Sequence, residues 1–331
     1  MEILKQFKDK AKLLNGTVIL PESDDCRILH AAQEIIKTGL AKVVLVGKPD
    51  EVRTRAKLDG YDITGATIED PASYPEIDAF ADYYYAKRKH KGVTRTEAAE
   101  IVTLPLYFGA MMVKFGHVDG MVAGAANTTG AVIQASLRVV GVAPGLNTVS
   151  STLIMAIPDY LGEDRTFFFS DCAVVPVPTA EQLADIAIET AETARLLLDM
   201  EPKVTLLSFS TRGSAQHERV NKVREARKIL EQREVDFDFD GELQLDAAIN
   251  PEVAKRKAPD SKVAGMANIL IFPEIQSGNI GCKLVEHFAK AQMVGPIIQG
   301  LAAPICDLSR GCEWEDVVNT TAIVLLLAQH K

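Results

Sequence analysis

The chain has 331 residues, of which 47% are hydrophobic and 24% are charged, and its formal net charge is −9. This length favours two domains with sizeable cores. The acidic balance argues against a general nucleic-acid binder, which would normally be basic, but local basic clusters can still bind small anionic ligands.

The five cysteines form no CxxC pair and have no zinc-like spacing with histidine. This fits a reducing compartment, and a small buried side chain is the expected role of each cysteine, with a nucleophile as the alternative. The charged, amphipathic start lacks the apolar core of a signal peptide, and the apolar run at 322–328 is too short to cross a bilayer and is expected to be a buried helix. We therefore expect a cytoplasmic protein that neither enters a membrane nor binds a metal.

Short β-branched runs alternate with helical patterns in the first part of the chain. Residues 17–20 form a predicted strand that ends at Pro21, and Ser23 or Asp24 is expected to cap the next helix. The further predicted elements are strands at 42–47 and 118–124, a helix over 97–114 and a helix that begins near Thr128. This βαβ alternation predicts an α/β fold with a largely parallel sheet.

The same pattern repeats after Pro144-Gly145. The predicted strands are 149–154, 166–169, 204–208 and 269–272, and the predicted helices are 180–198 and 216–233. Residues 235–240 alternate with aspartates at 236, 238 and 240, which is typical of an edge strand whose charges face solvent.

Two α/β lobes are therefore predicted, with residues 1–147 plus 300–331 in the first lobe and residues 148–299 in the second. Because ligands in such folds bind at the carboxyl ends of strands and between domains, the active site is expected in the cleft between the lobes.

The most informative segment is Asp307 to Asp316, which follows a Gly/Pro-rich apolar stretch. Arg310 can hold a phosphate in a bidentate way, and Ser309 can donate a hydrogen bond to a developing oxyanion. Asp316 lies near the start of the last helix, whose dipole would keep its carboxylate ionised and usable as a base toward a thiol beside cations. The alternative for Asp316 is a simple helix-dipole partner.

Two further segments carry small hydroxyl side chains between a strand and a helix. In 207–215, which includes Ser208, Ser210 and Thr211, backbone N–H groups are predicted to bind phosphate oxygens, with a helix cap as the alternative. In 124–130, Thr128 is predicted either to cap a helix or to stand on the rim of a ligand site.

Three other segments are less specific. Residues 278–283, which include Asn279, are predicted to form a tight turn. The basic run 87–91 is predicted to be a solvated helix end or a docking site for the distal phosphate of a large ligand. Residues 21–27 are predicted to form an acidic, capped helix start. None of these segments has metal-ligand spacing, and no histidine is assigned to catalysis.

Taken together, these motifs resemble the phosphate acetyltransferase (phosphotransacetylase) family, from Pro21-Glu22 almost to the C-terminus. The motifs that carry the resemblance are 122–125, 207–211, 240–248, 257–261, 278–281 and 307–311. The resemblance implies a three-layer α/β/α fold in two lobes, related to isocitrate and isopropylmalate dehydrogenases. It also implies reversible acetyl transfer between coenzyme A and phosphate, as in acetate metabolism, commonly by a homodimer. Coenzyme A would then be a substrate, with no bound cofactor.

The resemblance also assigns roles to individual residues. The aspartate that matches Asp316 deprotonates the coenzyme A thiol, and the thiolate then attacks acetyl phosphate in a ternary complex. The residue that matches Ser309 steadies the oxyanion, the one that matches Arg310 binds phosphate, and the one that matches Arg88 is associated with coenzyme A. The remaining predicted substrate-binding residues are Thr128, Arg138, Ser208, Ser210, Thr211, Asn279, Gly295 and Pro296.

Three positions depart from the family pattern. Gln134 stands where the family usually has an arginine, and Arg138, one turn later on the same helix face, is expected to supply part of the missing charge. Cys282 replaces a usual tyrosine. Glu313 stands where a serine cap is common, and its like charge is expected to act on Asp316.

Other functions were weighed against acetyl transfer. A phosphate butyryltransferase would need a longer acyl pocket, which a sequence does not reveal. A β-decarboxylating dehydrogenase would need clustered aspartates for a metal and a dinucleotide site, and neither signature is clear. A non-catalytic regulatory lobe would be expected to lose part of the set Ser309, Arg310 and Asp316, and all three remain.

Overall fold

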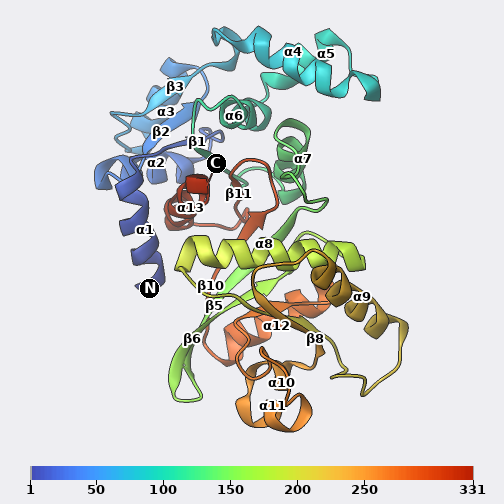
Figure 1. Ribbon diagram of the computed structural model, residues 1–331. Coiled ribbons are helices and arrows are strands. Elements are labelled where there is room, and N and C mark those ends of the chain that lie inside the picture. Colours follow the sequence, from blue (N-terminus) through green and yellow to red (C-terminus); the bar gives the residue numbers. More distant parts are fainter. Residues whose placement is uncertain (1, 331) are drawn as a thin grey trace. The chain divides into compact units, whose positions relative to one another are not determined.

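The computed structural model describes residues 2–330, which form two compact units (Figure 1). Unit 1 comprises the residues up to Ala143 and from Leu301 on, and unit 2 comprises Pro144–Gly300. Among the described residues, no helix is both long and apolar enough to cross a membrane.

Unit 1 has a five-stranded sheet in the order β11-β4-β1-β2-β3, and all of its pairings are parallel. The strands are β1 (Thr17–Leu20), β2 (Lys42–Val46), β3 (Thr67–Glu69), β4 (Gly120–Ala123) and β11 (Ile305–Asp307). The helices are α1 (Glu2–Leu14), α2 (Cys26–Thr38), α3 (Pro49–Asp59), α4 (Ile77–Arg88), α5 (Arg95–Val102), α6 (Pro105–Lys114), α7 (Thr129–Val139) and α13 (Trp314–Leu327), with short 3-10 helices η1 (Pro71–Ser73), η2 (Lys89–Lys91) and η3 (Ala328–His330).

Helices cover both faces of this sheet, so the central strands β4 and β1 are apolar except for Thr17, as in other parallel sheets. Two glycines allow α6 and α13 to approach the sheet closely. A Cβ at Gly109 of α6 would lie 2.6 Å from the sulfur of Met121, and a Cβ at Gly120 would lie 2.7 Å from Val324 of α13. Because Gly120 and Met121 are consecutive strand residues, α6 and α13 pack on opposite faces.

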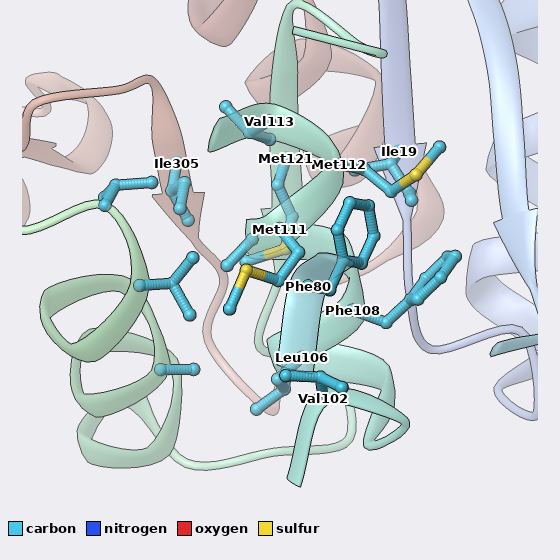
Figure 2. Packing of buried hydrophobic residues seen from close by; sticks show 14 of the residues in the cluster. Ile19, Phe80, Val102, Leu106, Phe108, Met111, Met112, Val113, Met121 and Ile305 are labelled. Carbon is cyan, nitrogen blue, oxygen red and sulfur yellow. The ribbon is translucent and has the colours of Figure 1, made fainter. Parts of the chain in front are cut away.

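Figure 2 shows the core on the α6 face. Phe80 of α4 and Phe108 of α6 pack with their ring centroids 5.9 Å apart, beside the methionines of α6 and Met121 of β4. This core holds β4 and β11 in place from one side. The predicted burial of 322–328 is confirmed for residues 322–326 of α13, which packs on the other side, whereas Leu327 and Ala328 are half-buried.

Unit 2 has a six-stranded sheet in the order β10-β5-β6-β9-β7-β8. Its strands are β5 (Ser150–Tyr160), β6 (Glu163–Ser170), β7 (Lys203–Leu207), β8 (Asp238–Leu243), β9 (Ile269–Ile271) and β10 (Gln292–Gln299). Its helices are α8 (Ala180–Leu198), α9 (Glu218–Gln232), α10 (Leu245–Ile249), α11 (Pro251–Lys257) and α12 (Ile275–Phe288). The pairings among β6, β9, β7 and β8 are parallel, whereas β5 runs antiparallel to both β6 and β10. The predicted α/β class with mostly parallel sheets is confirmed.

One predicted helix is in fact two. The apolar period over 97–114 spans α5 and α6, and the break falls at Thr103 and Leu104. Pro105 is the reason, because a proline disfavours the helical conformation in the residue before it and suits the first turn of a new helix.

The predicted cap of α2 is also corrected. Asp25 is the N-cap, and its side chain accepts a hydrogen bond from the backbone N–H of Arg27 at 2.9 Å. Ser23 instead donates its hydroxyl to the carbonyl of Val46, so it ties β1 to β2.

The predicted edge strand is real but shifted, since β8 begins at Asp238 and lies at the edge of the sheet. Asp236 and Asp238 are exposed as expected, but Asp240 is buried and pairs with Arg212 at 2.6 Å. Burial of a carboxylate is tolerated here because a guanidinium and the neighbouring backbone satisfy it.

The predicted turn at 278–283 is wrong, because these residues lie inside α12. Gly278 has a packing role there: a Cβ would lie 2.5 Å from the carbonyl oxygen of Asp171. The glycine allows the helix backbone to approach the segment after β6 closely.

Candidate functional site

Two of the predicted segments meet at the carboxyl edge of the sheet in unit 1. Strands β4 and β11 are parallel neighbours with Ala123 opposite Asp307, and the N–H of Leu308 donates to the carbonyl of Ala123 at 2.8 Å. The loops that follow the two strands, 124–128 and 308–313, therefore start side by side. This edge is where open α/β sheets place their ligands.

Residues Ser309 to Cys312 form an exposed turn. The N–H of Cys312 donates to the carbonyl of Ser309 at 2.9 Å, and the N–H of Gly311 donates to Ser309 Oγ at 3.2 Å. Ser309 and Arg310 are both exposed, and no described residue forms a hydrogen bond or ion pair with the Arg310 guanidinium. The turn thus presents a hydroxyl and an unpaired cation to solvent, a combination that can bind an anion.

Asp316 lies in the first turn of α13. Its Oδ2 accepts a hydrogen bond from the N–H of Glu313, the N-cap residue, at 2.9 Å, so Asp316 takes part in capping the helix. This contact is a structural role that was not predicted for Asp316. The side chain is nevertheless exposed, and its second oxygen has no hydrogen-bond partner among residues 2–330. Trp314 anchors this helix start against His30, with ring centroids 4.3 Å apart.

Arg27, a residue without a predicted role, holds this turn in place. Its guanidinium donates to the carbonyls of Arg310 and Cys312, both at 2.8 Å, and to the carbonyl of Ala125 at 2.7 Å. Asp25 pairs with the same guanidinium at 2.6 Å. The three carbonyl groups that it contacts lie 98 to 285 residues away in sequence, so local sequence could not reveal these contacts.

Cys312 ends the turn. Burial raises the pKa of its thiol, although the nearby Arg27 acts in the opposite direction. This environment does not favour a thiolate nucleophile. Cys172, Cys282 and Cys306 are also buried, as expected, whereas Cys26 is exposed, which contradicts the prediction for that cysteine.

Asp307 is a buried carboxyl group at the end of β11. It is 4% exposed, and it accepts a hydrogen bond from the hydroxyl of Thr129 at 2.6 Å. Burial raises its pKa to about 6, and the charge of Glu22 acts in the same direction. Its other oxygen is buried without a hydrogen-bond partner among the described residues.

Two other predicted arginines of unit 1, Arg88 and Arg138, lie in one region, where α4 meets α7. Arg138 donates to the hydroxyl of Tyr107 at 3.1 Å. Burial raises the pKa of Tyr84, and the charges of Arg138 and Arg88 both act against this increase. The Nε of Arg88 is buried with no hydrogen-bond partner among residues 2–330. The basic run is thus only partly solvated, since Lys87 donates to the carbonyl of Val139 at 2.6 Å.

Thr128 caps α7, because its Oγ1 accepts from the N–H of Ala131 at 3.2 Å, and the side chain is exposed. Thr128 therefore has the capping role that was one of its two predicted roles. Gln134 is exposed on the same helix, one turn before the half-buried Arg138.

The hydroxyl loop of unit 2 differs from its prediction. Ser210 and Thr211 are buried, and Glu242 accepts hydrogen bonds from the hydroxyl of Ser210 and from the N–H of Gly213, both at 2.9 Å. Burial alone would raise the pKa of Glu242, but hydrogen bonds from Arg224 and Gly213 lower it to about 2. The protein's own carboxylate thus occupies donors that were predicted to bind phosphate.

Ser208 keeps access to a cavity of about 750 Å³ within unit 2, at the carboxyl ends of β7 and β9 and the starts of α9 and α12. The other lining residues are Val177, Leu207, Phe209, Glu218, Arg219, Lys222, Leu245, Phe272, Pro273, Glu274, Gln276 and Ser277. Burial lowers the pKa of Lys222, whose ammonium donates to the carbonyls of Pro178 and Pro273 at 3.0 and 2.7 Å. A second cavity, of about 690 Å³ in unit 1, is lined by residues between 53 and 68 and contains none of the predicted site residues.

The other predicted residues of unit 2 lie elsewhere on it. Asn279 lies on α12 and donates to the carbonyl of Cys172 at 3.2 Å. Gly295 and Pro296 lie in a bulge of the edge strand β10, which three strands separate from β7. A bulge in an edge strand accounts for a glycine with φ of +121° followed by a proline.

No group of three or more histidine, cysteine, aspartate or glutamate side chains within residues 2–330 could hold a metal ion.

Comparisons with known proteins agree with the resemblance. The family model described as "Phosphate acetyl/butaryl transferase" matches residues 2–325. A phosphate acetyltransferase of Clostridium acetobutylicum is 50% identical over 331 residues, which cover 100% of this chain and 99% of the relative. A phosphotransacetylase structure from Streptococcus pyogenes superimposes with a TM-score of 0.94 at 38% identity and covers 100% of this chain and 99% of its own.

A more distant structure shows the breadth of the fold. A putative 4-hydroxythreonine-4-phosphate dehydrogenase from Salmonella typhimurium has a TM-score of 0.52 at 11% identity, covering 95% of this chain and 98% of its own. At that identity the likeness concerns the fold alone, and it agrees with the expected relation to dehydrogenases. The family model covers almost the whole chain, and the relatives match it over their full length. The chain therefore belongs to the phosphate acetyl/butyryl transferase family.

Proposed function

We propose that this protein is a phosphate acetyltransferase, which transfers an acetyl group reversibly between coenzyme A and phosphate. The observation that carries the proposal is the exposed turn of Ser309 and Arg310, followed by the exposed carboxylate of Asp316 at the start of α13. The full-length relatives named phosphate acetyltransferase support it.

The three side chains suit successive steps of one reaction. Asp316 takes the proton of the coenzyme A thiol, and the thiolate attacks the carbonyl carbon of acetyl phosphate. Ser309 donates a hydrogen bond to the oxyanion that forms on the carbonyl oxygen. The carbon–oxygen bond to phosphate then breaks, and phosphate leaves beside the unpaired guanidinium of Arg310. The reverse reaction runs through the same steps.

The energetics allow a carboxylate to act as the base. With reference acidities, transfer of a proton from a thiol to a carboxylate is uphill by roughly 6 kcal/mol. An enzyme that turns over about 1 to 1000 times per second has a barrier of roughly 13–17 kcal/mol, so this cost fits within it. The Arg310 cation reduces the cost further, because it stabilises the thiolate.

Coenzyme A is the larger substrate, and we assign Arg88 and Arg138 to its phosphates. The unpaired Nε of Arg88 supports this assignment, because a buried N–H without a partner favours an anionic acceptor. The predicted substrate contacts of Thr128, Ser208, Ser210, Thr211, Asn279, Gly295 and Pro296 remain part of the proposal. Among these, Ser208 has the strongest support, since it lines a cavity large enough for part of such a ligand.

The length of the acyl group separates acetyl transfer from butyryl transfer. The experiment is to measure thioester formation from coenzyme A with acetyl, propionyl and butyryl phosphate. We expect kcat/KM to be highest for acetyl phosphate and to fall as the chain lengthens. A maximum at butyryl phosphate would identify a butyryltransferase, and no thioester with any of the three would exclude both activities.

We further propose that the protein is a cytoplasmic homodimer whose partners are its small-molecule substrates. Support for the dimer comes from α12, where Ile280, Leu284 and Phe288 are 58%, 51% and 83% exposed. Their spacing of four residues places them on one helix face, and such an exposed apolar stripe marks an interaction surface.

A further inference from the structure

Glu22 is the best-bound carboxylate of unit 1. It is 6% exposed, and it lies two residues after the end of β1. Four consecutive backbone N–H groups, at Gly124, Ala125, Ala126 and Asn127, donate to it at 2.8, 2.9, 3.1 and 2.9 Å, and Asn127 Nδ2 adds a fifth hydrogen bond at 2.7 Å. Convergent backbone N–H groups of this kind form an anion cradle.

This cradle lies in the loop that leads to the start of α7. Beyond it, Thr128 caps the helix and Thr129 donates to Asp307, so the loop is connected to the end of β11. The connection is tight, because a Cβ at Gly124 would lie 2.5 Å from Asp307 Oδ1. Ser309 and Arg310 begin two residues after Asp307.

The cradle thus has the geometry of a phosphate site, but the protein itself fills it. We infer that Glu22 is a positioning residue: its carboxylate acts as a built-in anion that fixes the 124–127 loop and, through Thr129 and Asp307, the Ser309–Arg310 turn. The substrate phosphate therefore binds outside the cradle, and the cradle supplies rigidity instead of binding energy.

A neutral side chain cannot do the same. In Glu22→Gln the amide oxygen accepts from two of the N–H groups, whereas the amide NH₂ faces the other two donors. In Glu22→Ala the cradle is empty, and a small carboxylate such as formate can enter it. The inference rests on the proposed acetyl transfer for its activity readout, but formate binding can be measured without that readout.

The test uses full-length Glu22→Ala, Glu22→Gln and wild type, with Glu51→Ala as the control for loss of an exposed carboxylate, since the side chain of Glu51 is 71% exposed. We expect kcat of Glu22→Ala to fall roughly 10- to 1000-fold, as when a catalytic group loses its preorganised position. Formate should restore part of this loss in a saturable way, and it should raise the melting temperature of Glu22→Ala alone.

Glu22→Gln should be slow and insensitive to formate, because its side chain still occupies the space. The inference is overturned if Glu22→Gln has the wild-type kcat, or if formate changes neither the activity nor the melting temperature of Glu22→Ala. A wild type without acetyl transfer would refute the proposed function. The effect of formate on the melting temperature would then still decide whether the cradle holds an anion.

Discussion

At the scale of single residues, the site contains exposed side chains held by buried ones. Ser309, Arg310 and Asp316 face solvent, and the buried partners that fix them are Glu22 and Asp307, together with the half-buried Arg27. The exposed set could be predicted from residue type and local spacing. The residues that hold these side chains in place could not be predicted in the same way. The hydrogen-bond partners of Glu22, for example, are more than 100 residues away in sequence.

Ser309 gives the most direct residue-scale prediction. Ser309→Ala removes the hydroxyl that we assign to the oxyanion, and kcat should fall roughly 10- to 1000-fold. Ser309→Thr keeps a hydroxyl and should retain much more activity. Steady-state rates of thioester formation for both variants provide the measurement, and equal rates for the alanine and threonine variants would contradict the role.

Glu189 in α8 predicts an effect on stability. It is 3% exposed, and burial raises its pKa from 4.5 to about 8. Between these two pKa values the folded chain keeps a proton that the unfolded chain releases, so the free energy of unfolding falls as pH rises.

Glu189→Gln removes this titration. Between pH 4.5 and about 8, the free energy of unfolding of the variant should therefore fall by roughly 2–4 kcal/mol less than that of wild type. Urea unfolding of wild type and variant at several pH values between about 5 and 8 measures the slope. The explanation is wrong if the two proteins have the same slope.

At the scale of elements, most strands and helices could be predicted because their signals are local. α8 has the predicted bounds, 180–198, with Thr179 as its cap, and α9 differs from its prediction by two residues at the start and one at the end. The errors arise where a tertiary contact or a proline overrides the pattern. Pro105 divides one apolar period into two helices, and Gly278 is a helix-packing glycine that a local pattern cannot distinguish from a turn glycine.

The apolar stripe of α12 carries the prediction at this scale. Leu284→Glu places a charge in the middle of the stripe and should shift the protein from dimer to monomer. Leu58→Glu is the matched control, because Leu58 of α3 is 79% exposed and lies outside the stripe. Sedimentation velocity measures the change. A dimer that survives Leu284→Glu, or a wild-type monomer, would remove α12 as the interface.

At the scale of the whole molecule, an acidic protein is proposed to act on anionic substrates. The net charge of −9 does not prevent this, because single basic groups without an ion-pair partner can bind anions locally. Arg310 at the strand edge and Arg88 at the end of α4 are the examples in unit 1. Composition alone could exclude a general nucleic-acid binder but could not locate these groups, since their surroundings depend on the fold.

The most direct test of acetyl transfer through Asp316 is the rate of acetyl-coenzyme A formation from coenzyme A and acetyl phosphate by wild type and Asp316→Asn. Asparagine can still accept the hydrogen bond from the N–H of Glu313, so the start of α13 should remain intact while the base is lost. We predict rapid thioester formation by wild type and a kcat that is roughly 100- to 10,000-fold lower for Asp316→Asn. An asparagine variant within about threefold of wild type, or a wild type that forms no acetyl-coenzyme A, would contradict the account.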